Sequence, residues 1–378
     1  MIPLSVPNIS GNEWKYIKEC LDTNWVSSVG AYVNKFEAAV AAFTGAKYAV
    51  ATSNGTTGLH ISLQVADVKR NDFVLVSNIT FVASVNSITY VGAEPMLVDV
   101  CPDTWEMDMD LLGNFLERET KIEKGNCIHK KSKRRIKAIM PVHILGNMCD
   151  VDKLMKLSKK FKLTIVEDST EALGSYYHGQ HAGTFGKIGC LSFNGNKIIT
   201  TGGGGVIITN DEKLAKHAKH LTTQAKSDPF EYAHDEIGYN YRLVNILSAM
   251  GVAQMEQLPK FLKRKKEIVS KYKAAFKEIT GIGFQELTDG ATPNNWLVTI
   301  RVPDKKGLLD ELKKNEIEAR PLWVPMNRLP MYRKNIFVSE KNYSRKIYDQ
   351  CVSLPSSSGI TDKELDIVIA TVKKFFRK

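Results

Sequence analysis

A lysine, a carboxylate and a potential phosphate cradle each follow a short apolar run in this sequence. Lys197 lies in "LSFNGNKIITTGGGG", among small, polar and flexible residues, whereas a surface lysine needs no such setting because water satisfies its ammonium. Ser192 belongs to the same segment, and Asp168 ends the run "LTIVED". In "SNGTTGLH", the backbone N–H groups of Gly55 and Thr56 and the Thr56 hydroxyl are placed to hold a phosphate at a helix N-terminus.

Each feature has a simpler explanation when it is taken alone. Gly55 and Thr56 could form only a helix cap, Asp168 could be a cap or a metal ligand, and glycines 202–205 could form only a turn. The combination is more specific. A phosphate cradle, a carboxylate and a lysine match the three anchors of pyridoxal 5′-phosphate (PLP), namely its phosphate, ring nitrogen and aldehyde.

Alternating strand and helix patterns must position these residues. The helical patterns "TTGLHISLQVA" and "DVDKLMKLSKKF" separate apolar runs that are typical of buried strands. This alternation predicts an α/β fold with a mainly parallel sheet, whose strands bring ligands to their carboxyl ends. The predicted strands cover residues 48–52, 73–77, 95–100, 136–142 and 163–168.

The pattern changes from about Gln257 onward. A long basic helix leads to the strand-like "NWLVTIRV", to "KGLLDELKKNEIEAR" and to a final helical pattern, "DKELDIVIATVKKFFRK". We therefore predict a large domain at residues 1–256 and a smaller C-terminal α/β domain at residues 257–378.

Composition excludes several classes of protein. The chain has 378 residues, 43% hydrophobic and 25% charged, as ordinary globular proteins have, and no apolar run reaches the roughly 18 residues of a membrane span. Six scattered cysteines without a C-x-x-C pair signal neither a disulfide framework nor a metal site. Much of the +11 net charge lies in "KIEKGNCIHKKSKRRIK" (residues 121–137), which is typical of a solvated loop or hairpin and lacks the aromatic residues of a nucleic-acid surface. We expect a cytoplasmic protein that binds neither nucleic acid nor membrane.

Motifs along nearly the whole chain resemble the fold type I, PLP-dependent nucleotide-sugar aminotransferases of the DegT/StrS type. The resemblance implies a PLP-dependent transferase fold, PLP as cofactor, glutamate as amino donor and a nucleotide-linked keto sugar as acceptor. The motifs are "WVSSVGAYVNKFE", "SNGTTGLH", "TFVASVN", "PVHILGN", "VEDSTEALGS", "GTFGKIGCLSFNGNK", "GYNYRLVNI" and "ARPLW".

The resemblance also implies a role for individual residues. Lys197 matches the lysine that forms a Schiff base with the cofactor and moves a proton, and Asp168 matches the carboxylate that keeps the ring nitrogen protonated. Asn240 matches a residue that reaches the phosphate from the neighbouring subunit, so the resemblance implies a homodimer with shared active sites. The remaining implied cofactor contacts are Gly55, Thr56 and Ser192 at the phosphate, Phe81 stacked on the ring, and Glu171 near the ring hydroxyl.

The substrate is less closely specified. The chain is most similar to the branch that aminates C4 of UDP-2-acetamido-4-keto-2,6-dideoxyglucose, on the way to bacillosamine or legionaminic-type sugars. Lys226 and Arg320 would supply cations for a diphosphate and Trp323 a flat wall for a base, although Arg320 and Trp323 could equally pack the domains together. A C3 or C4 aminotransferase acting on a dTDP- or GDP-linked keto sugar is the alternative. Related 3-dehydratases carry histidine where this chain has Lys197, and a non-catalytic PLP-fold regulator would need a DNA-binding region for which we find no segment.

Overall fold

A central β-sheet forms the framework of the larger part of the protein in the computed structural model, which describes residues 1–228 and 230–377. The strands from β10 to β18 are parallel to their neighbours, whereas β11 is antiparallel to both β1 and β10. The predicted mainly parallel sheet is confirmed. Its order is β1 (Tyr48–Thr52), β11 (Gly205–Thr209), β10 (Ile188–Ser192), β7 (Thr164–Asp168), β6 (Arg135–Met140), β2 (Phe73–Ser77), β3 (Glu94–Val98) and β18 (Phe337–Val338).

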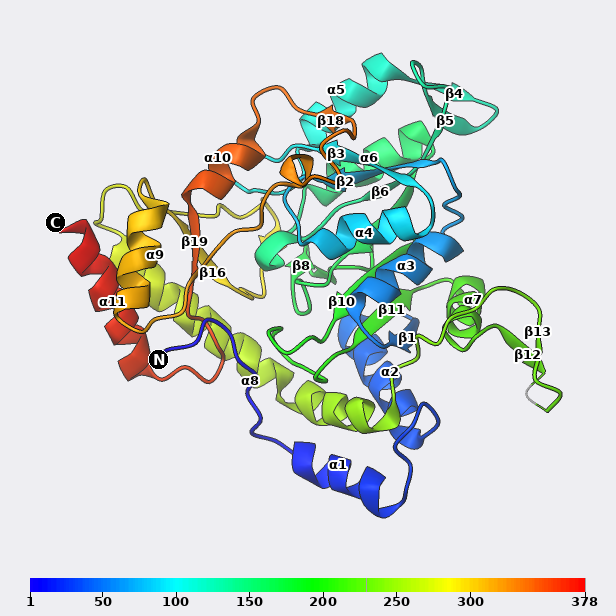
Figure 1. Cartoon of the computed structure of the whole chain (residues 1–378), viewed down its shortest axis with the longest axis horizontal. Coiled ribbons are helices and arrows are strands. Elements are labelled where there is room, and N and C mark those ends of the chain that lie inside the picture. Colours follow the sequence, from blue (N-terminus) through cyan, green and yellow to red (C-terminus); the bar gives the residue numbers. More distant parts are fainter. Residues whose placement is uncertain (229, 378) are drawn as a thin grey trace.

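Helices cover both faces of this sheet (Figure 1). In β11, Ile207 packs into one hydrophobic cluster while Val206 and Ile208 pack into another, because successive side chains point to opposite faces. This two-sided burial explains why the strands are continuous apolar runs. The covering helices are α3 (Gly55–Val65), α4 (Val82–Tyr90) and α7 (Glu212–Thr222) on one face, and α2 (Ala31–Thr44), α5 (Met109–Glu119) and α6 (Val151–Phe161) on the other.

The smaller part contains an antiparallel sheet of β14 (Gly283–Phe284), β16 (Val298–Arg301), β19 (Cys351–Leu354) and β17 (Arg320–Pro321). The predicted strand in "NWLVTIRV" is β16, and the predicted final helical pattern is α11 (Asp362–Phe376). The segment "KGLLDELKKNEIEAR" carries α9 (Lys305–Lys314). Buried residues of both helices, such as Leu308 and Val368, pack with Ile300 of β16.

One long helix, α8 (Asn245–Phe276), joins the two parts and crosses the predicted boundary between residues 256 and 257 (Figure 1). The chain also returns later, because β18 pairs with β3 of the large sheet. The division at this position stays a prediction. The other elements are α1 (Glu13–Asp22), β8 (Tyr176–Tyr177), β9 (Gln180–His181), β12 (Lys226–Asp228), β13 (Ala233–His234), β15 (Ala291–Thr292), α10 (Tyr343–Gln350) and the 3-10 turns η1 (Ile144–Gly146) and η2 (Met326–Arg328).

The basic segment forms a hairpin of β4 (Thr120–Glu123) and β5 (Asn126–His129) that continues the sheet beside β6. Part of its charge is paired, since Arg134 contacts Glu94 and Arg135 contacts Asp72. The six cysteines are free. Among the helices of residues 1–228 and 230–377, none is long and apolar enough to span a bilayer.

Candidate active site

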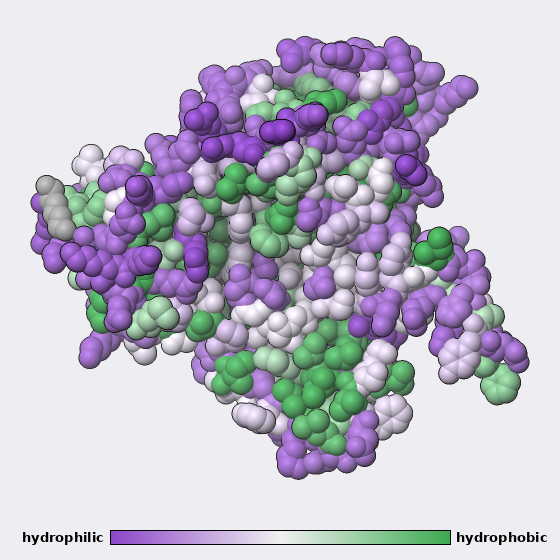
Figure 2. Space-filling model, viewed as in Figure 1, coloured by the Kyte–Doolittle hydropathy of each residue, from purple (hydrophilic) through white to green (hydrophobic). Residues whose placement is uncertain are grey.

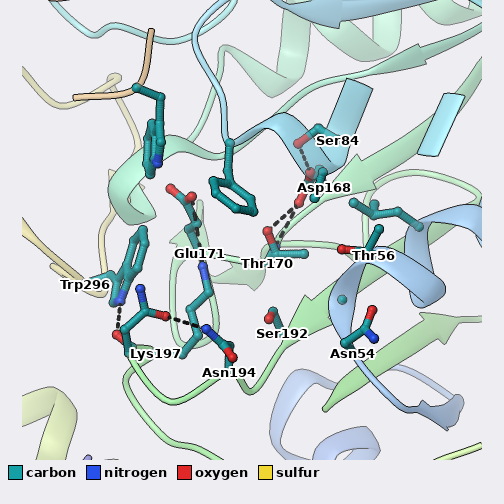
Figure 3. Close-up of a pocket in the computed structure, with 16 residues that line it drawn as sticks. Asn54, Thr56, Ser84, Asp168, Thr170, Glu171, Ser192, Asn194, Lys197 and Trp296 are labelled. Carbon is teal, nitrogen blue, oxygen red and sulfur yellow. Dashed lines mark hydrogen bonds and ion pairs between the residues drawn. The ribbon is translucent and has the colours of Figure 1, made fainter. Parts of the chain in front are cut away.

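Most residues predicted for catalysis or cofactor binding line a cavity of ≈ 310 Å³ at the carboxyl ends of β7 and β10 (Figure 3). The N-terminus of α3 forms one wall, and the segment after β10 that carries Lys197 forms another. A cavity of this size suits a small organic ligand. Its lining residues are Asn54, Gly55, Thr56, Leu59, Phe81, Ala83, Ser84, Asp168, Thr170, Glu171, Ser192, Asn194, Asn196, Lys197, Trp296 and Trp323.

The N-terminus of α3 provides the phosphate end of the cavity. Asn54 caps the helix, because its side chain accepts a hydrogen bond from the Thr57 N–H at 2.9 Å, and Gly55 and Thr56, whose N–H groups come before it, line the cavity. A Cβ atom on Gly55 would lie 3.0 Å from the Cβ of Ser192, so a larger residue would crowd the approach of this helix to β10. The Thr56 and Ser192 hydroxyl groups lie on either side of this close approach. This corner fits a phosphate group.

Asp168 lies at the end of β7 with 1% of its surface exposed. One carboxylate oxygen accepts a hydrogen bond from the Ser84 hydroxyl at 2.6 Å, and the other accepts from the N–H and hydroxyl of Thr170 at 3.1 and 2.7 Å. These donors hold the carboxylate at a defined position. Such a carboxylate fits a protonated pyridine nitrogen.

Lys197 extends into the cavity between an aromatic ring and a carboxylate (Figure 3). Its Nζ atom lies 3.8 Å from the ring centroid of Trp296 and 4.0 Å from Oε1 of Glu171. Burial lowers the pKa of the ammonium, and the charges of Glu171 and Asp168 partly oppose this shift. A lysine with a lowered pKa releases its proton more readily, and the neutral amine is the form that attacks a carbonyl.

The pKa of Glu171 shifts upward, in the opposite direction to the pKa of Lys197. Burial raises its pKa to about 7, although the Lys197 ammonium and the Leu145 N–H, which donates to the carboxylate at 2.8 Å, both lower it. The carboxyl group can therefore hold or release a proton near neutral pH beside the lysine.

Aromatic rings form the outer walls. Phe81 is the N-cap residue of α4, keeps 53% of its surface exposed and lines the cavity. Trp296 and Trp323 stack with their centroids 6.3 Å apart and their planes 14° from parallel. Flat apolar faces of this kind suit planar rings.

Three predicted site residues lie away from the cavity of this chain. Asn240 is exposed and pairs through a backbone bridge with Thr223. The Lys226 ammonium lies 4.5 Å from the Tyr232 ring, and the guanidinium of Arg320 contacts Glu318 at 2.8 Å. None of the three lines the cavity, and their roles stay predictions.

The cavity also contains residues that sequence reasoning missed. Ser84 and Thr170 lie within motifs that were recognised ("TFVASVN" and "VEDSTEALGS"), but only the folded chain brings both onto Asp168. Trp296 lies at the start of a segment that was recognised only as a strand, and no local pattern links it to Lys197. The other missed lining residues are Asn54, Leu59, Ala83, Asn194 and Asn196.

Comparisons with known proteins agree with this geometry. A family profile described as "DegT/DnrJ/EryC1/StrS aminotransferase family" matches residues 7–373. The chain is 35% identical to EpsN of Bacillus subtilis (strain 168), over 99% of this chain and 96% of that protein. It is 36% identical to the GDP-perosamine synthase of Escherichia coli O157:H7, over 99% of this chain and 98% of the relative.

A solved structure supports the cofactor assignment. Spr1654 from Streptococcus pneumoniae in its PLP-form superposes with a TM-score of 0.89 at 27% identity, covering 100% of this chain and 98% of that one. The phosphate corner, the restrained carboxylate and the buried lysine described above fit the same cofactor. The chain therefore belongs to the DegT/DnrJ/EryC1/StrS family of PLP-dependent nucleotide-sugar aminotransferases.

Proposed function

We propose that the protein transfers an amino group from glutamate to the C4 ketone of a nucleotide-linked 4-keto-6-deoxy sugar. The observation that carries this proposal is the position of Lys197, whose buried amine enters the same cavity as Asp168 and the N-terminus of α3. Because the cavity contains lysine where related dehydratases have histidine, the site is suited to amino transfer.

Each side chain has a task in this reaction. When bound, PLP supplies an electron sink for the negative charge that develops at the substrate carbon. Lys197 holds the cofactor and moves the proton at that carbon, since its amine is buried and its pKa is lowered. Asp168 keeps the ring nitrogen protonated, and Ser84 fixes the carboxylate in place. The Glu171 carboxylate, 4.0 Å from the Lys197 amine, raises the pKa of that amine and so affects how readily it gives up its proton.

Two acceptor classes are supported by different observations. The motif resemblance favours UDP-2-acetamido-4-keto-2,6-dideoxyglucose, whereas the similarity to the GDP-perosamine synthase of E. coli favours a GDP-linked sugar. Trp323 lies in the cavity wall, where a sugar or base ring could stack. Lys226 and Arg320 lie outside the cavity of their own chain, so a contact with the diphosphate would have to come from a neighbouring subunit or from domain movement.

The proposal includes a homodimer with shared active sites. Figure 2 shows hydrophobic side chains gathered where α1, α2 and the start of α8 lie in Figure 1. Trp25, Val26 and Val29, which connect α1 to α2, are 55%, 41% and 67% exposed, and an apolar surface of this kind is typical of a protein interface. Asn240 is exposed in the single chain and remains free to reach a partner's phosphate corner.

A half-reaction panel tests the acceptor. The enzyme is first loaded with amine by glutamate, with 2-oxoglutarate measured, and is then mixed separately with UDP-, dTDP- and GDP-linked 4-keto-6-deoxy sugars while the spectrum of lysine-bound cofactor is followed. Recovery of this spectrum with the keto sugar of only one nucleotide identifies the nucleotide of the acceptor. If glutamate releases no 2-oxoglutarate and none of the sugars restores the spectrum, a PLP-sensing role replaces amino transfer.

Mixed subunits test the shared site. Lys197→Ala should abolish turnover and Asn240→Ala should weaken cofactor retention, while a mixed dimer has one site with both intact residues if these come from different chains. Recovered activity after verified subunit exchange supports sharing, and continued inactivity contradicts it.

A further inference from the structure

Two histidines and two carboxylates converge at a place remote from the cavity. His217 and His220 lie one turn apart on α7, and Asp235 and Glu236 directly follow β13. The β12–β13 hairpin projects from the body of the protein beside α7 (Figure 1). Residues from two elements therefore face each other across the base of the hairpin.

The distances describe a shared centre. Nε2 of His220 lies 2.6 Å from Oδ1 of Asp235, and Nε2 of His217 lies 2.9 Å from Oε1 of Glu236. The same Glu236 oxygen lies 3.8 Å from Nε2 of His220, so two imidazoles approach one carboxylate oxygen. The ligand atoms of His220, Asp235 and Glu236 all lie within 4.8 Å of one another.

The donor set suits a borderline divalent cation. Imidazole nitrogens and carboxylate oxygens bind Zn²⁺ at about 2.0–2.2 Å, which places neighbouring ligand atoms of a tetrahedral site roughly 3.3 Å apart. The observed separations of 2.6, 2.9 and 3.8 Å lie on both sides of that value. The side chains of His217, Asp235 and Glu236 are 43%, 57% and 42% exposed, so they can adjust slightly and a cation can enter.

We propose that His220, Asp235 and Glu236 form a binding site for a divalent transition cation of the zinc class, which ties the β12–β13 hairpin to α7, with His217 beside it on the Glu236 carboxylate. Without a cation, hydrogen bonds link His220 to Asp235 and His217 to Glu236, whereas a cation would bind the His220 imidazole and both carboxylates at once. Asn240 follows Glu236 by four residues. A cation here would also restrict the segment that leads to Asn240, although binding does not depend on the role of that residue.

Zinc titration of the chelator-treated, full-length protein tests the site. Competition with a chromogenic zinc indicator should show one Zn²⁺ per chain. Glu236→Gln and the double variant His217→Ala/His220→Ala should each bind roughly 10–100-fold more weakly, because losing a ligand costs at least as much as losing a supporting contact. Circular dichroism of each variant confirms its fold.

His234→Ala is the matched control. His234 lies on the same exposed hairpin, but its Nδ1 atom contacts the Gln224 carbonyl at 2.7 Å and it is outside the cluster, so the variant should bind Zn²⁺ as the parent does. Zn²⁺ should also slow tryptic cleavage after Lys226 in the parent and not in the double variant. If the parent binds no Zn²⁺ more tightly than roughly 10 µM, or if the double variant binds equally well, the proposal is wrong.

Discussion

Replacing Ser84 by alanine should destabilise the cofactor-free protein by about 1.5–3 kcal/mol. The Ser84 hydroxyl is 2% exposed and donates to the Asp168 carboxylate at 2.6 Å, a length typical of a charge-assisted hydrogen bond. Its removal leaves a buried carboxylate with Thr170 alone as side-chain donor. The free energy of unfolding, measured by urea denaturation at pH 7, gives the magnitude.

Ser87 provides the matched control. It lies on the same helix with 0% exposure, and its hydroxyl donates to a neutral acceptor, the Ser84 carbonyl, at 2.7 Å. Ser87→Ala should therefore cost only about 0.5–1.5 kcal/mol, while both substitutions gain the same helix propensity. Ser84→Ala should also release cofactor faster during dialysis. Equal destabilisation by the two variants would refute the assignment of Ser84 as the residue that holds a charged Asp168.

Three further predictions concern the cavity and its surroundings. Glu171→Gln should lower the pKa of the Lys197 ammonium further, because the Glu171 carboxylate, 4.0 Å away, raises it. The rate of cofactor attachment should then reach its plateau at a lower pH. An unchanged pH profile would contradict the pairing of the two residues. Gly55→Ala should weaken cofactor retention, since its Cβ would lie 3.0 Å from that of Ser192; equal retention in dialysis would show that the corner can widen. Burial lowers the pKa of His181 to about 4, so between pH 6.5 and 4 the unfolded chain binds a proton that the folded chain does not. The free energy of unfolding should therefore fall by about 3 kcal/mol as the pH drops through that range. His181→Gln should flatten this pH dependence, which urea unfolding at several pH values can show.

Local sequence patterns predicted several of the strands and helices and placed Asp168 at the end of one strand of the sheet and Lys197 after another. The predicted strands at residues 48–52 and 73–77 coincide with β1 and β2, because each is a continuous apolar run of the kind that a doubly covered sheet requires. Lys197 and Asp168 could be predicted because each follows such a strand, and the carboxyl ends of neighbouring parallel strands meet at one edge.

The tertiary structure decided what surrounds those residues. Trp296 lies 99 positions after Lys197 in the sequence, and Ser84 lies 84 positions before Asp168, yet each pair is in contact. The pairing of β18 with β3 of the large sheet likewise joins segments that lie far apart in the sequence.

The physical reason is the range of the interactions. Strand and helix patterns arise from neighbours along the chain, so their periodicity is visible in the sequence. The distance between Glu171 and Lys197, the shift of both pKa values and the exclusion of Lys226 and Arg320 from the cavity depend on how separate elements pack and on how much water the packing removes. The sequence by itself therefore determined which groups stand at the ends of the strands, where they could take part in the chemistry, and the packing determined their distances, the shifts of their pKa values and the residues that contact them.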